Sequence, residues 1–448
     1  MRQSAACRFA QGLTVVTLAW GVLAFGAVYP WAYWSLAVVA IFAGAAGLWA
    51  VRGASDRSRV PIGVLVALGV IVGAAAMVQL LPVRTDLLER ITPNTVSTLR
   101  AYNLAFPSNE TGWFPLSIRP QATVESIALG GAAFVLMLGV CRLCSLIGVR
   151  WLAKSVTVLG VFVAMSGIIQ KPLYTGNIYG FWQPEGNGLV FGPFVNRNHF
   201  AGWMMMALPV TLGLLCAGID RGMHGVKPVW RERLMWFGSA AASRLTVAGT
   251  AAGVMALSLV LTFSRSGMGA FGLAVVITGF FVLRRVDSAA RRAVGALYLV
   301  GLFSLILGWV GVDRIGSAFG HVNWREYNDR RGAWADARRI ASLFPLTGTG
   351  LGTYGVATLF YQQHDLEQHY EQAHNDYLEL AAEGGALVVI PVAMLLLAIT
   401  VRILTRFRDS GGSATSWAWQ CTRRHTNLVG SIEKYEGRIP DFLSGLSK

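Results

Sequence analysis

Charged residues are scarce in this chain. Asp, Glu, Lys and Arg make up 14% of its 448 residues, and hydrophobic residues make up 54%. Soluble proteins carry about 25% charged residues. Apolar runs of roughly 20 residues recur along the sequence, and each is long enough to cross a hydrocarbon core of about 30 Å. The strand alternation typical of outer-membrane proteins is missing. The shortage of charge therefore excludes an ordinary soluble fold and predicts an all-α, polytopic membrane protein.

These apolar runs predict ten transmembrane spans. They lie near residues 12–29, 31–51, 60–82, 124–141, 155–170, 200–217, 245–263, 266–283, 293–311 and 385–401. The spans contain almost no carboxylates, lysines or histidines, which transporters and pumps usually keep near the membrane midplane. Inverted repeats of broken spans are not evident either. Both absences disfavour a transporter.

Acidic residues are nearly missing from alternate loops. The loops at 1–11, 52–59, 142–154, 218–244 and 284–292 hold 17 Lys and Arg against 4 acids. The loops on the opposite side are close to balanced. An excess of Lys and Arg in short loops marks the cytoplasmic side of a membrane. The net charge of +15 is therefore a topology signal rather than a nucleic-acid surface, and we expect the N-terminus in the cytoplasm.

Common metal-binding and nucleotide-binding patterns are also missing. No D-x-D string is present to hold a metal-bound nucleotide sugar, and no H-x-x-x-H pair of the metalloprotease kind occurs. Cys141 and Cys144 have C-x-x-C spacing, but no second pair completes a zinc site. The run Gly348–Gly352 lacks a following Gly-Lys-Ser/Thr and is interpreted as a flexible joint. We therefore predict neither a metal nor a cofactor.

Four parts are predicted along the chain. Residues 1–311 form a transmembrane domain with nine spans, and residues 312–384 form a large outside loop. Residues 385–403 contain the last span, and residues 404–448 form a polar cytoplasmic tail.

The large outside loop is expected to be helical. From Trp334 to Phe344, apolar residues recur at helical spacing. A second helix is expected at about 355–371, and a third begins near Gln372 and continues into the last span. A structureless loop of 73 residues would be unusual. We therefore expect a helical cap on the outer side of the membrane domain.

An arginine stands at the outer start of the sixth predicted span. Arg197 is surrounded by Asn196, Asn198 and His199. A helix N-terminus with several donors and an arginine suits an anion, and Asn196 is suited to cap the helix. The competing interpretation is an arginine that only reaches the lipid headgroups.

A second arginine lies between two closely coupled spans. Arg265 stands in a short connection, flanked by Ser264 and Ser266. Its guanidinium offers a planar fork of donors that never loses its charge, which suits a phosphate clamp. The competing interpretation is a residue that only ends the span.

A histidine precedes the last span. His374 is followed by Asn375 and Asp376. A histidine near neutral pH can take a proton from a sugar hydroxyl, and Asp376 or Glu383 could orient or replace that base. The competing interpretation is a solvated loop.

Two further arginines lie in the same large loop. Arg330 and Arg331 form a basic patch that suits an anionic donor or acceptor. Asp329 and Asp336 lie nearby, so ordinary surface pairing is the alternative.

Six strings recur in a characteristic order. They are P-L-S-I-R-P-Q-A-T at 115–123, F-V-N-R-N-H-F-A-G at 194–202, T-F-S-R-S-G at 262–267, R-R-G-A-W-A-D-A at 330–337, P-L-T-G-T-G-L-G at 345–352 and A-H-N-D-Y-L-E-L-A-A-E-G-G at 373–385. Together they resemble the O-antigen ligase and O-antigen polymerase superfamily of bacterial envelope glycosyltransferases. The similarity covers roughly 80–405, and the ligase-like region is at about 180–400.

The resemblance implies a GT-C-like glycosyltransferase in the bacterial inner membrane, with its active site facing the periplasm. It implies metal-independent transfer of a glycan from undecaprenyl diphosphate to a hydroxyl acceptor, as in lipopolysaccharide or exopolysaccharide biosynthesis. Arg197 and Arg265 match the arginines that bind the diphosphate, and His374 matches the histidine beside the reacting sugar. We expect further substrate contacts from Asn196, Asn198, Ser264, Arg330, Arg331, Asn375 and Asp376.

The acceptor stays open at this point. A ligase acting on lipid A-core, a polymerase acting on a growing polysaccharide and a protein O-oligosaccharyltransferase would share the same donor site. A polysaccharide or lipid transporter is the alternative from a different class. Family members commonly continue with further spans, so we expect residues 409–448 to be a truncated or frame-altered end.

Overall fold

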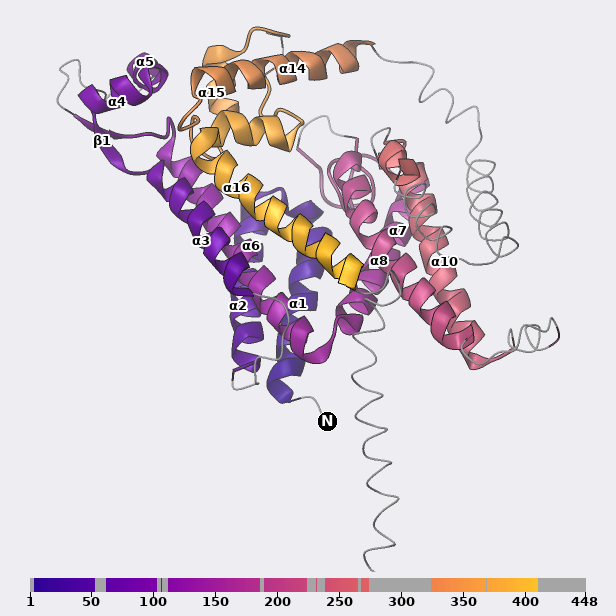
Figure 1. Cartoon of the computed structure of the whole chain (residues 1–448). Helices are drawn as coiled ribbons and strands as arrows, with labels where there is room; N and C mark the ends of the chain where they lie inside the picture. The colour runs from indigo at the N-terminus through magenta and orange to yellow at the C-terminus, as the bar shows by residue number, and fades with distance from the viewer. Residues whose placement is uncertain are drawn as a thin grey trace, which may run out of the picture. The chain divides into compact units, whose positions relative to one another are not determined.

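The described part of the chain is mostly helical (Figure 1). The structure, a computed structural model, describes residues 4–52, 62–102, 106, 112–185, 189–223, 231, 238–264, 267–273, 324–367 and 369–409. Its helices are α1 (Ala5–Leu23), η1 (Phe25–Ala27), α2 (Pro30–Ala50), α3 (Ile62–Val78), α4 (Thr85–Ile91), α5 (Pro93–Tyr102), α6 (Pro120–Ile147), α7 (Arg150–Leu173), α8 (Arg197–Met223), α10 (Ala240–Leu261), α14 (Trp324–Leu343), α15 (Tyr354–Tyr361) and α16 (Asp376–Asp409). One antiparallel pair of short strands, β1 (Pro82–Arg84) and β2 (Trp113–Pro115), places Val83 opposite Phe114.

Seven of the described helices are long and apolar enough to cross a membrane. They are Ala5–Leu23, Pro30–Ala50, Pro120–Ile147, Arg150–Leu173, Arg197–Gly218, Ala242–Leu261 and Asp376–Thr405. Gly63–Val78 is a shorter apolar helix. The prediction of an all-α, polytopic membrane protein is therefore confirmed. The predicted span at 293–311 and most of the one at 266–283 lie outside the described residues, as does the tail from 410 onward.

The chain divides into two compact units. The first comprises Met1–Thr14, Tyr33–Arg142 and His321–Ile403. The second comprises Val15–Ala32, Leu143–Gly320 and Leu404–Lys448. Each unit has its own buried cores.

In the first unit, small residues let membrane helices approach closely. A Cβ atom at Gly44 of α2 would clash with the backbone of Val135 in α6, and one at Gly139 would clash with Gly44. A Cβ atom at Gly69 of α3 would likewise clash with the ring of Phe134. Membrane helices associate through such small residues because lipid offers no hydrophobic driving force between them.

A second core of the first unit lies where α14 and α15 pack with the start of α16 (Figure 1). Ala337 and Ile340 of α14 and Phe344, which directly follows α14, are buried there with Tyr354 of α15 and Ala382 of α16. Ala337, Ile340 and Phe344 are apolar positions whose spacing predicts a helix in the large loop, and that helix ends at Leu343, two residues before Pro345 and close to its predicted end.

The second predicted helix of the loop is shorter than expected. The sequence predicts this helix at about 355–371, but α15 (Tyr354–Tyr361) ends at Tyr361. The buried carboxylate of Asp336, on α14, accepts the backbone N–H groups of Gln363 and His364, both at 3.2 Å. It also lies 2.8 Å from the His364 imidazole. These bonds hold the chain in a turn, so the helix stops there.

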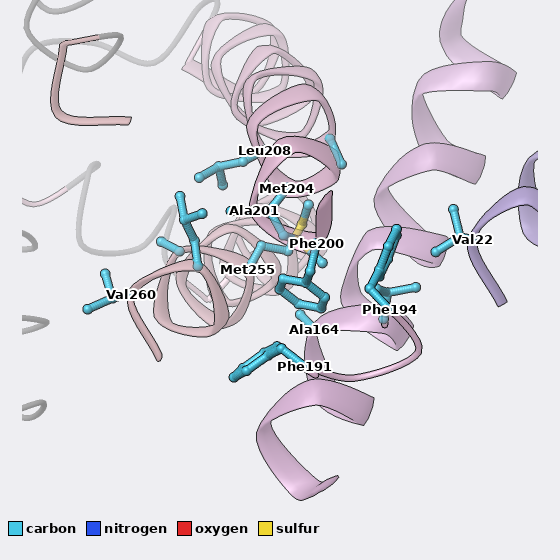
Figure 2. Close-up of a cluster of buried hydrophobic side chains, with 14 of the residues drawn as sticks. Val22, Ala164, Phe191, Phe194, Phe200, Ala201, Met204, Leu208, Met255 and Val260 are labelled. Atoms are coloured by element: carbon cyan, nitrogen blue, oxygen red, sulfur yellow. The ribbon is translucent and has the colours of Figure 1, made fainter. Parts of the chain in front are cut away.

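The second unit is a bundle of α7, α8 and α10. Phe200 and Met204 of α8 and Met255 of α10 are fully buried between the helices (Figure 2). Gly160 of α7 faces the end of the Met255 side chain, and Gly167 lies against the ring of Phe191. The close approach at both glycines brings the last turn of α7 near the loop that leads into α8.

The first predicted span, 12–29, also has different ends in the structure. α1 begins at Ala5 and ends at Leu23. The chain then turns through Phe25, Gly26 and Ala27, which all have positive φ. The Phe25 ring stacks on Trp182, with centroids 4.7 Å apart, and this contact fixes the turn within the second unit.

Candidate functional site

The start of α8 is fixed by Asn196. Its side-chain Oδ1 accepts the backbone N–H of Asn198 at 2.8 Å, which confirms the predicted cap. The N–H of Arg197 donates to the carbonyl of Leu189 at 2.7 Å. Arg197 is half-buried at the first position of the helix, and its side chain has partners of its own. A guanidinium is thereby held at a helix N-terminus, where the dipole favours anions.

The end of α10 leads into a strained turn. Phe263 has a φ of 51°, a left-handed conformation that is uncommon for any residue other than glycine. Ser264 is 1% exposed, and its backbone N–H donates to Oγ1 of Thr262 at 3.1 Å. The Ser264 hydroxyl donates to Oδ1 of Asn198 at 2.8 Å. Arg265 and Ser266 lie outside the described residues.

The structure therefore brings two of the predicted strings together within the second unit. Asn198 follows Arg197 directly, and Ser264 precedes Arg265 directly. Because a hydrogen bond joins Asn198 to Ser264, the residue after Arg197 lies beside the last described residue before Arg265.

Lys171 is a residue of this region that sequence reasoning missed. Its ammonium group donates to the carbonyl of Leu261 and lies 4.1 Å from the centroid of the Phe263 ring. A lysine near the end of a span usually reaches toward headgroups, and the sequence alone gives no sign of a partner 90 residues away. A cation at the C-terminal carbonyls of a helix is favourable.

His374 lies in the first unit, at the start of α16. Its φ is 50°, and its side chain is exposed. Asn375 is the cap of the helix, because its Oδ1 accepts the N–H groups of Tyr377 at 3.1 Å and Leu378 at 3.2 Å. Asp376 is exposed in the first turn. The predicted residues His374, Asn375 and Asp376 thus form one helix start.

A buried glutamate ties α16 to the glycine run. Glu383 is 8% exposed, and its carboxylate accepts the N–H groups of Gly352 at 2.9 Å and Tyr354 at 2.7 Å. Gln79, fully buried, donates to the carbonyls of Thr347 at 2.7 Å and Glu383 at 2.8 Å. The interpretation of Gly348–Gly352 as a flexible joint is wrong: the run is a packed turn held from both sides.

The tyrosine at the start of α15 joins this turn to α14. Its hydroxyl donates to the carbonyl of Ala333 at 3.2 Å. Burial raises the pKa of Tyr354, and the nearby carboxylates of Asp336, Glu379 and Glu383 raise it further. Tyr354 therefore stays neutral and donates.

The predicted basic patch on α14 is only partly described. Arg331 is exposed and has interactions of its own, and the side chain of Arg330 lies outside the described residues. The alternative, in which Asp336 pairs at the surface, is wrong for this residue, because Asp336 is 0% exposed and binds the turn at 363–364. Within the described part of the chain, no group of three His, Cys, Asp or Glu side chains lies together as metal ligands would.

These features define a multi-pass α-helical membrane protein with polar, strained turns at the ends of its apolar helices. Residues 250–404 match the family model described as O-antigen ligase. The match covers about a third of the chain, and this part of the chain is similar to the O-antigen ligase family. Comparison with the curated proteins and with the solved structures finds no significant match.

Proposed function

We propose that this chain transfers a glycan from undecaprenyl diphosphate to a hydroxyl acceptor at the periplasmic face of the bacterial inner membrane. The hydrogen bond between Ser264 and Asn198 carries this proposal, because it joins the string of Arg197 to the string of Arg265. An arginine in each of the two joined strings suits a diphosphate, which offers only acceptor oxygens.

The reaction is a single displacement. The acceptor oxygen attacks the anomeric carbon, the bond from that carbon to the diphosphate oxygen breaks, and the acceptor proton passes to His374. The configuration at the anomeric carbon is therefore inverted. Arg197 and Arg265 stabilise the negative charge of the leaving diphosphate, the role that a metal has in other transferases.

The other predicted substrate residues divide between the two substrates in this proposal. Asn196, Asn198 and Ser264 shape the diphosphate site by fixing the helix start and the turn. Asn375 fixes the backbone beside His374, and the exposed Asp376 and Arg331 are available to the glycan or the acceptor. Arg330 is adjacent to Arg331 in the sequence, and we propose the same role for it.

Transfer in proteoliposomes tests the proposal. The full chain would be supplied with lipid-diphosphate-linked glycan and, in turn, with lipid A-core, with a second copy of the lipid-linked glycan, and with a Ser/Thr peptide. We expect transfer to one acceptor that persists with a chelator, and that acceptor distinguishes ligase, polymerase and protein oligosaccharyltransferase. Flux of lipid-linked glycan across the bilayer without transfer to any acceptor would contradict the proposal and favour a transporter.

A further inference from the structure

We propose that the end of α7, through Gln170 and Lys171, forms a further side of the diphosphate-binding site. The inference rests on the proposed function, because it deepens the donor site of the second unit. Neither residue belongs to a string that carries the family resemblance.

Lys171 places a cation over the strained turn after α10. Its ammonium group donates to the carbonyl of Leu261 and lies 4.1 Å from the ring centroid of Phe263. It lies 5.8 Å from the ring centroid of Phe191, which precedes α8 in the same unit. Lys171 thus stands between the two segments that Ser264 and Asn198 join. Its side chain is exposed, so a ligand at the surface of the turn can reach it.

Gln170 supplies the second observation. Its side-chain Nε2 is buried and has no hydrogen-bond partner within the described residues. Leaving a buried donor unpaired is unfavourable, so such a group in a folded protein calls for an explanation such as a ligand. Three buried side-chain nitrogens of this unit lack a partner among the described residues. The one in Gln170 belongs to the residue directly before Lys171 in the sequence.

The donors of this region match an anion that only accepts hydrogen bonds. Asn198 uses its Oδ1 to accept from Ser264, so the nitrogen of its amide is the part left to donate. The N-terminus of α8, the amide of Gln170 and the ammonium of Lys171 add donors or positive charge. Phosphate oxygens bind charged and neutral donors of this kind. A neutral sugar, which also donates, would leave this excess of donors unpaired.

Binding of undecaprenyl diphosphate, without glycan, to the full chain in nanodiscs tests the inference. Gln170→Met removes the amide at similar volume, and Lys171→Met removes the charge. We expect each to weaken binding about tenfold, and we expect Lys171→Arg to restore most of it. Lys154→Met, at the other end of α7, should leave affinity within about twofold because it lies far along the helix from the site.

Thermal unfolding without ligand separates binding from structure. Gln170→Met removes an unpaired buried donor, so we expect its melting temperature to stay the same or rise while its affinity falls. Wild-type affinity in Gln170→Met and Lys171→Met, together with loss in Arg197→Met, would overturn the inference and leave the proposed function intact. No binding by the wild type would overturn the proposed function itself.

Discussion

At the scale of single residues, two strained positions stand in the strings that carry the proposed chemistry. Phe263 and His374 have φ values of 51° and 50°. A left-handed conformation of this kind costs about 1–3 kcal/mol and persists only where the surroundings enforce it. The bond from Ser264 to Asn198 holds the backbone directly after Phe263, and His374 precedes the capped start of α16.

We predict that His374→Asn retains the fold but loses transfer. Asn tolerates left-handed backbone better than most residues, so the melting temperature should match that of the wild type. Loss of a general base typically lowers the rate by about 100-fold or more, and the transfer rate in proteoliposomes measures it. His369→Asn, at an exposed histidine of the same loop, is the matched control and should transfer normally. Equal rates in the two variants would remove His374 from the reaction.

At the scale of elements, the glycine run and the start of α16 form one packed joint. Gln79 donates to Thr347, which lies 268 residues later in the sequence, and accepts from the N–H of Leu351 at 3.1 Å. Glu383 binds the other end of the run. α16 continues past a break at Gly385, where φ is 54° and ψ is −167°. The joint therefore fixes the segment that begins with His374 to the end of α3.

Gly348→Ala should disrupt this joint. Gly348 has a φ of 64°, and a Cβ atom there would clash with the carbonyl of Glu383. Both the strain and the clash destabilise the variant, so we expect a clearly lower melting temperature and little transfer. Gly131→Ala, in α6, is the control because a Cβ there meets nothing within 4 Å. It should be neutral or slightly stabilising.

Gln79→Leu tests the same joint from α3. The change leaves the Thr347 carbonyl and the Leu351 N–H without the partner that Gln79 provides, and it removes one of two donors to the Glu383 carbonyl, so we expect a loss of about 2 kcal/mol in stability. Thermal unfolding of the purified chain in detergent would show it as a lower melting temperature. Gln121→Leu removes one exposed, 3.4 Å bond to Glu125 and should change nothing measurable. Similar melting temperatures for the two variants would contradict the structural role of Gln79.

At the scale of the whole molecule, apolar length and local pattern predicted the elements well. The apolar runs predicted α2, α6, α7 and α8 to within a few residues at most ends, and Asn196 was recognised as a cap from its preference for that position. Local pattern cannot show contacts between distant segments. The end of α15, the burial of Asp336 and the roles of Gln79 and Lys171 all depend on partners far along the chain.

The residues with proposed roles belong to different units: His374 lies in the first and Arg197 in the second. Donor binding is assigned to the cations of the second unit, and proton transfer to His374. A variant that loses proton transfer should therefore still bind the donor, and donor binding can be measured in it. This separation is the central claim about the molecule.

The most direct test is single-turnover transfer in proteoliposomes, with donor binding measured on the same samples. We predict that His374→Ala binds undecaprenyl-diphosphate-linked glycan normally but transfers it at least about 100-fold more slowly. Arg265→Lys should instead weaken donor binding, because an ammonium group lacks the planar fork of donors. Wild-type transfer rates in His374→Ala, or wild-type donor affinity in Arg265→Lys, would contradict the account.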